Sequence, residues 1–138
     1  MNNYKLKDLS IGMCESFQVE ITQEKMDLFY KLTNDNSPIH MDNDYAKNRG
    51  FDSKVCYGML QASFFSTLAG VYMPGENCVL HQVDAKFTKP VYIGDVLTIK
   101  GEIIEINETF NVITIKGFIT NQNGKKVCRA TIQAGVVK

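Results

Sequence analysis

The sequence predicts an α+β protein in which a curved antiparallel sheet wraps around one long central helix. The segment from Val55 to Gly75 contains no charged side chain, so the helix that it forms must be covered on most of its sides. The chain after residue 76 consists of strand-like segments separated by turn residues, an order typical of antiparallel sheets. The length of 138 residues fits one domain, which we expect to span residues 1–138.

The first half of the chain predicts one strand and short helices around a loop. Residues Glu15 to Ile21 alternate between apolar and polar side chains, which indicates a strand. Thr22 is suited to cap a following helix. Turn-forming residues from Thr33 to His40 predict a loop, and Asp42 to Asn48 predicts a short helix. The side chains of the first helix that we expect to face inward are Met26, Phe29, Tyr30 and Leu32.

The second half predicts the central helix and the rest of the sheet. The helix is expected from Gly58 to Tyr72, and Pro74-Gly75 ends it. Asn123-Gly124 predicts a hairpin with a two-residue turn in which both residues have positive φ, and Asn107 to Thr109 predicts a second hairpin. The expected strands are Asn77 to Thr88, Val96 to Ile106, Phe110 to Asn121 and Lys125 to Val137.

Composition excludes several classes of function. Fifteen basic residues balance fifteen acidic ones, which leaves no electrostatic footprint for nucleic acid or an anionic membrane. The four cysteines lack the close spacing of zinc or redox sites, and the polar N-terminal segment does not resemble a secretory signal. Polar residues and glycine dilute the uncharged segment, so we expect a buried helix and not a membrane span. We therefore predict a cytoplasmic protein with free thiols, no metal, no cofactor, and no nucleic-acid or membrane partner.

The segment from Asp35 to His40 is the first that could carry chemistry. A carboxylate and an imidazole stand five residues apart, and Pro38 between them fixes one φ angle and favours an extended Ser37. Such a loop could aim both side chains at one water molecule and move its proton. On these residues alone, Asp35 could also cap the next turn and His40 could be a packed loop residue.

Two further segments suggest how a carbonyl group or an anionic carrier would bind. Gly58 opens the central helix, where backbone N–H groups are free, and a carbonyl oxygen could approach closely because glycine has no side chain. This would form an oxyanion hole, although the glycine could instead serve close helix packing. Lys86 and Lys89 could attract an anionic carrier, and solvated strand charges explain them as well.

Together, the three segments resemble the MaoC-like family of hot-dog-fold proteins, which includes the (R)-specific enoyl-CoA hydratases. The loop signature of that family, Ser/Thr-Gly-Asp-x-Asn/Ser-Pro-aliphatic-His, is similar to Thr33 to His40. Its His-Gly-Met-Leu helix start is similar to Tyr57 to Leu60, and its Phe-x-x-Pro-Val-x-x-Gly-Asp stretch to Phe87 to Asp95. The chain departs from the pattern at Asn34, where the family has glycine, and at Tyr57, where it has histidine. Asparagine tolerates the left-handed conformation better than most residues.

The resemblance implies a hot-dog fold and a hydro-lyase of fatty acid metabolism. The implied reaction is the (R)-specific hydration of trans-2-enoyl thioesters, or the reverse dehydration of 3-hydroxyacyl thioesters. Asp35 and His40 would activate the water, and the N–H of Gly58 would polarise the thioester carbonyl. The implied partners are an acyl-CoA or acyl-carrier substrate and a second copy of the chain, as a homodimer or a dimer of dimers. The implied substrate-binding residues are Ser37, Tyr57, Met59, Ser66 and Ala69.

Two other functions stay open at this point. A hot-dog-fold thioesterase would direct an activated water at the carbonyl carbon and not at the β-carbon. Thioesterases and acyl-carrier dehydratases often place an acidic residue on the central helix, and Gly58 to Met73 contains none. A non-catalytic protein that binds acyl thioesters is the other alternative, with Asn34 and Tyr57 as signs of departure from an active pattern.

Overall fold

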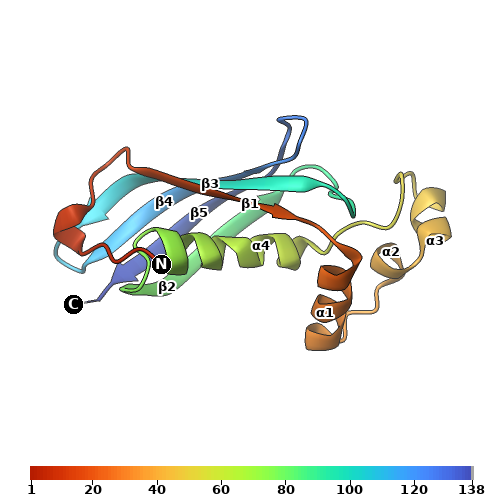
Figure 1. The fold of residues 1–138 in the computed structure, drawn as a ribbon, viewed down its shortest axis with the longest axis horizontal. Coiled ribbons are helices and arrows are strands. Elements are labelled where there is room, and N and C mark those ends of the chain that lie inside the picture. Colours follow the sequence, from red (N-terminus) through yellow and green to blue (C-terminus); the bar gives the residue numbers. More distant parts are fainter. Residues whose placement is uncertain (138) are drawn as a thin grey trace.

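The computed structural model describes residues 1–137 and shows a five-stranded antiparallel sheet curved around a helix (Figure 1). The strand order is β1-β3-β4-β5-β2, so β1 and β2 form the two edges. The strands are β1 (Cys14–Glu20), β2 (Cys78–Phe87), β3 (Val96–Asn107), β4 (Val112–Thr120) and β5 (Lys126–Val136). The central helix α4 (Gly58–Thr67) continues directly as a π-helical turn, η2 (Leu68–Tyr72). The predicted fold class is confirmed, and within residues 1–137 no helix has the length and hydropathy that a membrane span requires.

The short helices lie together beyond one end of the sheet, beside the N-terminal end of α4 (Figure 1). They are α1 (Gln23–Thr33), α2 (Pro38–Met41) and α3 (Asn43–Asn48), and a 3-10 turn η1 (Leu6–Asp8) precedes β1. Thr22 caps α1 as predicted, because its hydroxyl accepts a hydrogen bond from the Lys25 N–H at 3.2 Å. Met26 is buried as expected, but the prediction for Leu32 is wrong, since this side chain is 79% exposed. Leu32 lies roughly 240° around the helix from Met26, on the side away from the core.

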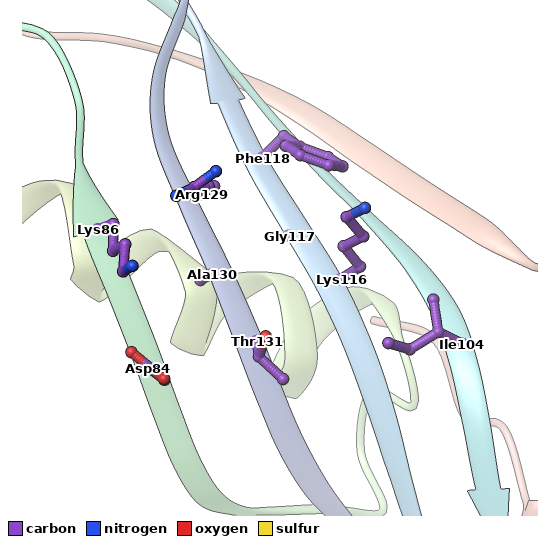
Figure 2. Close-up of a pocket in the computed structure, with 9 residues that line it drawn as sticks. All are labelled: Asp84, Lys86, Ile104, Lys116, Gly117, Phe118, Arg129, Ala130 and Thr131. Atoms are coloured by element: carbon purple, nitrogen blue, oxygen red, sulfur yellow. The ribbon is translucent and has the colours of Figure 1, made fainter.

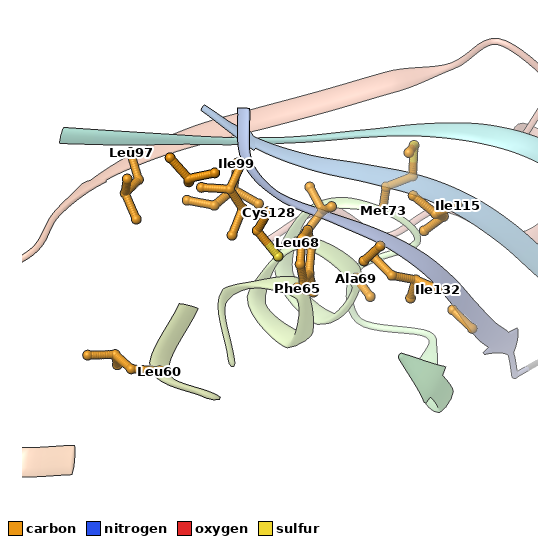
Figure 3. Packing of buried hydrophobic residues seen from close by; sticks show 14 of the residues in the cluster. Leu60, Phe65, Leu68, Ala69, Met73, Leu97, Ile99, Ile115, Cys128 and Ile132 are labelled. Atoms are coloured by element: carbon orange, nitrogen blue, oxygen red, sulfur yellow. The ribbon is translucent and has the colours of Figure 1, made fainter. Parts of the chain in front are cut away.

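The hydrophobic core fills the space between the concave face of the sheet and α4 (Figure 3). Phe65 and Leu68 point from the helix toward the strands and are fully buried. Two glycines let the helix approach the sheet closely. A Cβ atom on Gly101 would lie 2.7 Å from the Leu68 side chain, and one on Gly117 would lie 2.7 Å from Phe65. The position of α4, and therefore of its N-terminus, is set by this packing.

The hairpin between β4 and β5 forms where the sequence predicts it, but its turn is longer than expected. Only Gly124 has a positive φ, of 74°, and Asn123 does not. The side-chain oxygen of Asn121 accepts hydrogen bonds from the N–H of Asn123 at 3.0 Å and of Lys125 at 3.1 Å. This side chain stabilises a wider turn and thereby replaces the two-residue turn that requires two positive φ angles.

The outer face of the sheet carries a hollow of about 430 Å³ that none of the predicted catalytic or substrate-binding residues lines (Figure 2). Lys86, Lys116 and Arg129 border it, with α4 behind the strands. Lys86 and Arg129 are direct cross-strand neighbours. Lys86 thus lies on the face opposite α4, whereas Lys89 borders a cavity at the N-terminus of α4. The structure separates the two lysines considered for carrier binding.

Candidate active site

The segment that joins α1 to α2 holds Asp35 at the surface. Asn34 ends α1 with a left-handed φ of 58°, and its N–H donates to the Tyr30 carbonyl at 2.7 Å. Asparagine therefore adopts the conformation for which the family signature uses glycine. The Oδ1 atom of Asp35 accepts a hydrogen bond from the Ser37 N–H at 3.1 Å, which fixes the carboxylate in an Asx-turn. Ser37 contributes through its backbone to the orientation of Asp35.

His40 lies on α2, a helical turn where the sequence predicted loop. Pro38 is the first residue of this turn, because its φ is already set for a helix and it has no N–H to satisfy. The Nδ1 atom of His40 is 2.6 Å from the backbone carbonyl oxygen of Val55. A carbonyl oxygen can only accept, so Nδ1 carries the proton and Nε2 of the neutral ring has a free lone pair. This contact orients the half-buried imidazole as a base.

Tyr57 connects Asp35 with His40. Its hydroxyl donates to the backbone carbonyl of Asp35 at 2.7 Å, and its ring packs against the His40 ring with centroids 4.2 Å apart. Burial, followed by the charge of Asp35, raises the pKa of the Tyr57 phenol, so the hydroxyl stays a donor at neutral pH. Tyr57 is only 2% exposed. Tyr57 therefore holds Asp35 through its hydroxyl and His40 through its ring, and the hydroxyl proton is already donated to a protein carbonyl.

Gly58 begins α4 and borders the same cavity as His40, whose volume is about 320 Å³. Within residues 1–137 the Gly58 N–H has no hydrogen-bond acceptor, while the Gln61 N–H donates to the Tyr57 carbonyl at 3.3 Å. A Cβ atom on Gly58 would lie 3.2 Å from the ring of Phe87, so a larger residue would crowd this wall. The cavity lining comprises His40, Phe51, Val55, Cys56, Gly58, Gln61, Phe87, Thr88, Lys89 and Pro90.

A second, more apolar cavity of about 370 Å³ lies between α4 and β2. Of the predicted substrate-binding residues, Met59 and Ser66 border it. Phe87 borders both cavities, so an acyl chain that passes Gly58 would reach the second cavity at this ring. Ala69 is fully buried in the core and borders neither cavity. The remaining lining residues are Ala62, Ser63, Leu80, Val83 and Ala85.

Gln61 is a residue of the first cavity that sequence analysis did not single out. The side chain is 2% exposed, and its Oε1 atom has no hydrogen-bond partner within the described chain. A signal was present in the sequence, because Gln61 is a long polar residue in an uncharged helix. It follows Gly58 by three residues and therefore lies on the same helix face.

The cysteines are free thiols as predicted, and two of them are poor nucleophiles. Burial, with a smaller effect from the Asp95 charge, raises the pKa of Cys56 to about 12. Burial also raises the pKa of Cys128 to about 11. Both side chains stay protonated at neutral pH, although Cys56 borders the cavity. Among the lining residues, acid–base chemistry therefore falls to the imidazole of His40, whereas Asp35 lies at the surface and does not line this cavity.

Comparison with known proteins places the whole site within one family, because the MaoC like domain matches residues 12–123. The chain belongs to the MaoC-like family. A 3-hydroxybutyryl-CoA dehydratase of Methylorubrum extorquens is 30% identical over 100 residues, which cover 72% of this chain and 64% of that protein. An (R)-specific enoyl-CoA hydratase of Rhodospirillum rubrum is 34% identical over 92 residues, which cover 67% of this chain and 64% of that protein. The chain thus spans slightly less than two thirds of the length of these two relatives.

The fold of this MaoC-like chain is shared with solved hydratase structures. The unliganded R-hydratase of Pseudomonas aeruginosa has a TM-score of 0.91 and 25% identity, and the match covers 99% of this chain and 87% of that one. The predicted hot-dog fold is therefore confirmed.

Proposed function

We propose that this MaoC-like protein is a hydro-lyase that adds water to trans-2-enoyl thioesters to give (R)-3-hydroxyacyl thioesters, or catalyses the reverse dehydration. The observation that carries this proposal is the cavity that His40 and Gly58 share. It offers the free Nε2 lone pair of His40 and the unpaired N–H of Gly58, with Asp35 linked to His40 through Tyr57. The names of the two relatives, a dehydratase and a hydratase, support it.

In this proposal, each step of the reaction is carried out by a named residue of the site. Asp35 and His40 hold a water molecule, and its oxygen forms a bond to C3 while Nε2 of His40 takes its proton. The electron pair of the C2–C3 double bond moves to the thioester oxygen, and the Gly58 N–H stabilises the resulting enolate. The Asp35 carboxylate offsets the positive charge on the imidazole. The protonated His40 then gives up its proton, which C2 takes as the enolate collapses, so that one water molecule is added and the site regains its starting protonation.

The substrate-binding residues divide into two groups in this proposal. Met59 and Ser66 contact the acyl chain, because they border the apolar cavity beyond Gly58. Ser37 and Tyr57 act indirectly, because they hold Asp35 and His40 in place. Ala69 lies behind this surface and supports it as a core residue.

A homodimer that pairs β2 with a second copy of β2 completes the proposal. β2 is an edge strand with an open row of backbone groups, which is a surface suited to another strand. Val79, Leu80 and Phe87 on β2 are 46%, 39% and 45% exposed, and the last two border the apolar cavity. A second copy there would cover that cavity. Light scattering at micromolar concentration tests whether the chain forms a dimer, and a monomer would contradict this arrangement. The same proposal includes a dimer of dimers as a larger assembly and a cytoplasmic role in fatty acid metabolism.

Turnover of crotonyl-CoA tests the reaction itself. The enoyl-thioester absorbance should fall with wild-type protein while no free CoA appears in a thiol assay. The Asp35→Asn variant should leave the absorbance almost unchanged, because its amide cannot act as the carboxylate does. Release of free CoA would instead identify a thioesterase, and binding of crotonyl-CoA without turnover would identify a binding protein. Either result would overturn the proposed reaction.

A further inference from the structure

Gln61 is buried at the candidate site without the hydrogen bonds that a buried carboxamide normally makes. Its Oε1 atom is enclosed and unpartnered within the described chain. The Nε2 atom is not enclosed in this way, and no hydrogen bond from it exists among residues 1–137. Buried polar side chains are nearly always paired in folded proteins, so a carboxamide that borders a cavity and whose Nε2 atom donates to nothing within the described chain points to a ligand that accepts a hydrogen bond from Nε2.

The geometry of α4 directs this side chain toward Gly58. Side chains in a helix tilt toward its N-terminus, so a residue covers the turn that precedes its own Cα atom. Gln61 lies one turn after Gly58 on the same face, and both residues border the cavity that contains His40. The carboxamide therefore extends toward the place where the unpaired Gly58 N–H would meet a carbonyl oxygen.

We propose that the Gln61 carboxamide is a second hydrogen-bond donor to the thioester carbonyl, beside the N–H of Gly58. This inference rests on the proposed hydration of enoyl thioesters and adds a group that touches the reacting carbonyl. Nε2 donates to the oxygen that becomes negative in the enolate, while Oε1 stays enclosed. Val55 and Phe51 border the same cavity with apolar side chains, and a hydrogen bond is stronger beside apolar groups than in water.

If Gln61 donates to the thioester carbonyl, its replacement by methionine should lower catalysis without lowering stability. A glutamine that held the fold together would lose hydrogen bonds when replaced by methionine, which is similar in length and cannot donate. Gln61 has no such bonds to lose within the described chain, so Gln61→Met should melt at the same temperature as the wild type or higher. The same substitution removes one donor from the oxyanion site, which typically lowers kcat by about 100-fold.

Three measurements on the 138-residue chain test this assignment. Crotonyl-CoA kinetics should show the fall in kcat with KM changed by less than about threefold. Infrared difference spectra of bound, carbonyl-labelled butyryl-CoA, which cannot be hydrated, should show a weaker carbonyl shift in Gln61→Met than in wild type. Thermal melting should show no loss of stability. Gln133→Met, a matched substitution on the exposed outer face of the sheet, should leave all three unchanged.

A Gln61→Met variant with wild-type kcat and a wild-type carbonyl frequency would overturn the assignment. A variant whose melting temperature falls together with its activity would show a structural role and would overturn it too. Failure of the proposed function is distinguishable from either result. If the wild type does not hydrate crotonyl-CoA, the proposed reaction fails, and the butyryl-CoA spectra alone still decide whether Gln61 contacts the carbonyl.

Discussion

Replacement of Tyr57 by phenylalanine isolates the contact that links the two halves of the candidate site. The substitution removes the 2.7 Å hydrogen bond to the Asp35 carbonyl but keeps the ring against His40 and Phe29. One such bond contributes about 1 kcal/mol to the free energy of unfolding. Asp35 is exposed, so water can solvate its carbonyl in the variant and the loss should not exceed this value by much. For a chain of this length, the melting temperature should fall by roughly 3–5 °C.

The catalytic effect of Tyr57→Phe should exceed its effect on stability. Without the hydrogen bond, the Asp35 segment is no longer fixed relative to the His40 ring, and a displacement on the order of 1 Å can cost up to about 100-fold in rate. We expect kcat for crotonyl-CoA to fall by about 10-fold. Urea denaturation of the same variant measures the change in the free energy of unfolding. Tyr30→Phe is a matched control, because the Tyr30 hydroxyl makes no side-chain hydrogen bond within residues 1–137. Wild-type kcat in Tyr57→Phe would refute the positioning role of this hydroxyl.

Three further changes test other parts of the structure. Gly58→Ala places a Cβ atom 3.2 Å from the Phe87 ring, so kcat/KM should fall by about 10-fold with little change in stability. An unchanged kcat/KM would show that the cavity wall at Gly58 and Phe87 tolerates a side chain. Gly101→Ala places a Cβ atom 2.7 Å from the Leu68 side chain in the packed core, so urea denaturation should show that the free energy of unfolding falls by about 1–3 kcal/mol. An unchanged urea concentration at the midpoint of unfolding would contradict this. The pKa of Cys56 rises from 9.0 to about 12 on folding, so the unfolded chain loses this proton first and stability should fall as pH rises above about 9, by up to about 1.4 kcal/mol per unit. Unfolding at about pH 8 and about pH 10 measures this slope, and Cys56→Ala should reduce it, leaving the part that the raised pKa of Cys128 contributes.

The sequence predicted the elements that follow from local pattern. The bounds of β1 to β5 fall within about two residues of the predicted strands, because alternation and turn residues mark strand ends. The length of the central helix was also predictable from Gly58 to Tyr72, although its last turn is π-helical. The Asn34 departure from the family signature was interpretable, since its observed φ of 58° is one that asparagine tolerates.

Other features depended on contacts that no local pattern encodes. The helical turn at Pro38 is held against Val55, whose N–H donates to the Ile39 carbonyl at 2.9 Å and whose carbonyl lies 2.6 Å from His40 Nδ1. The Asn121 side chain decides the width of the hairpin turn. The role of Tyr57 depends on which residues of α1 and α2 lie against it. The burial of Ala69 and the unpaired state of Gln61 follow from the rotation of α4 against the sheet, which is set by packing across the core.

The measurement that tests the central claim most directly is the rate of crotonyl-CoA hydration by Asp35→Asn, His40→Gln and the double variant. Residues that act on one water molecule work as a unit, so their effects on rate are not additive. We predict that each single variant loses most of the activity and that the double variant is scarcely slower than either. Near-normal turnover in one single variant, or a double variant whose loss is the product of two independent losses, would contradict a shared water between Asp35 and His40.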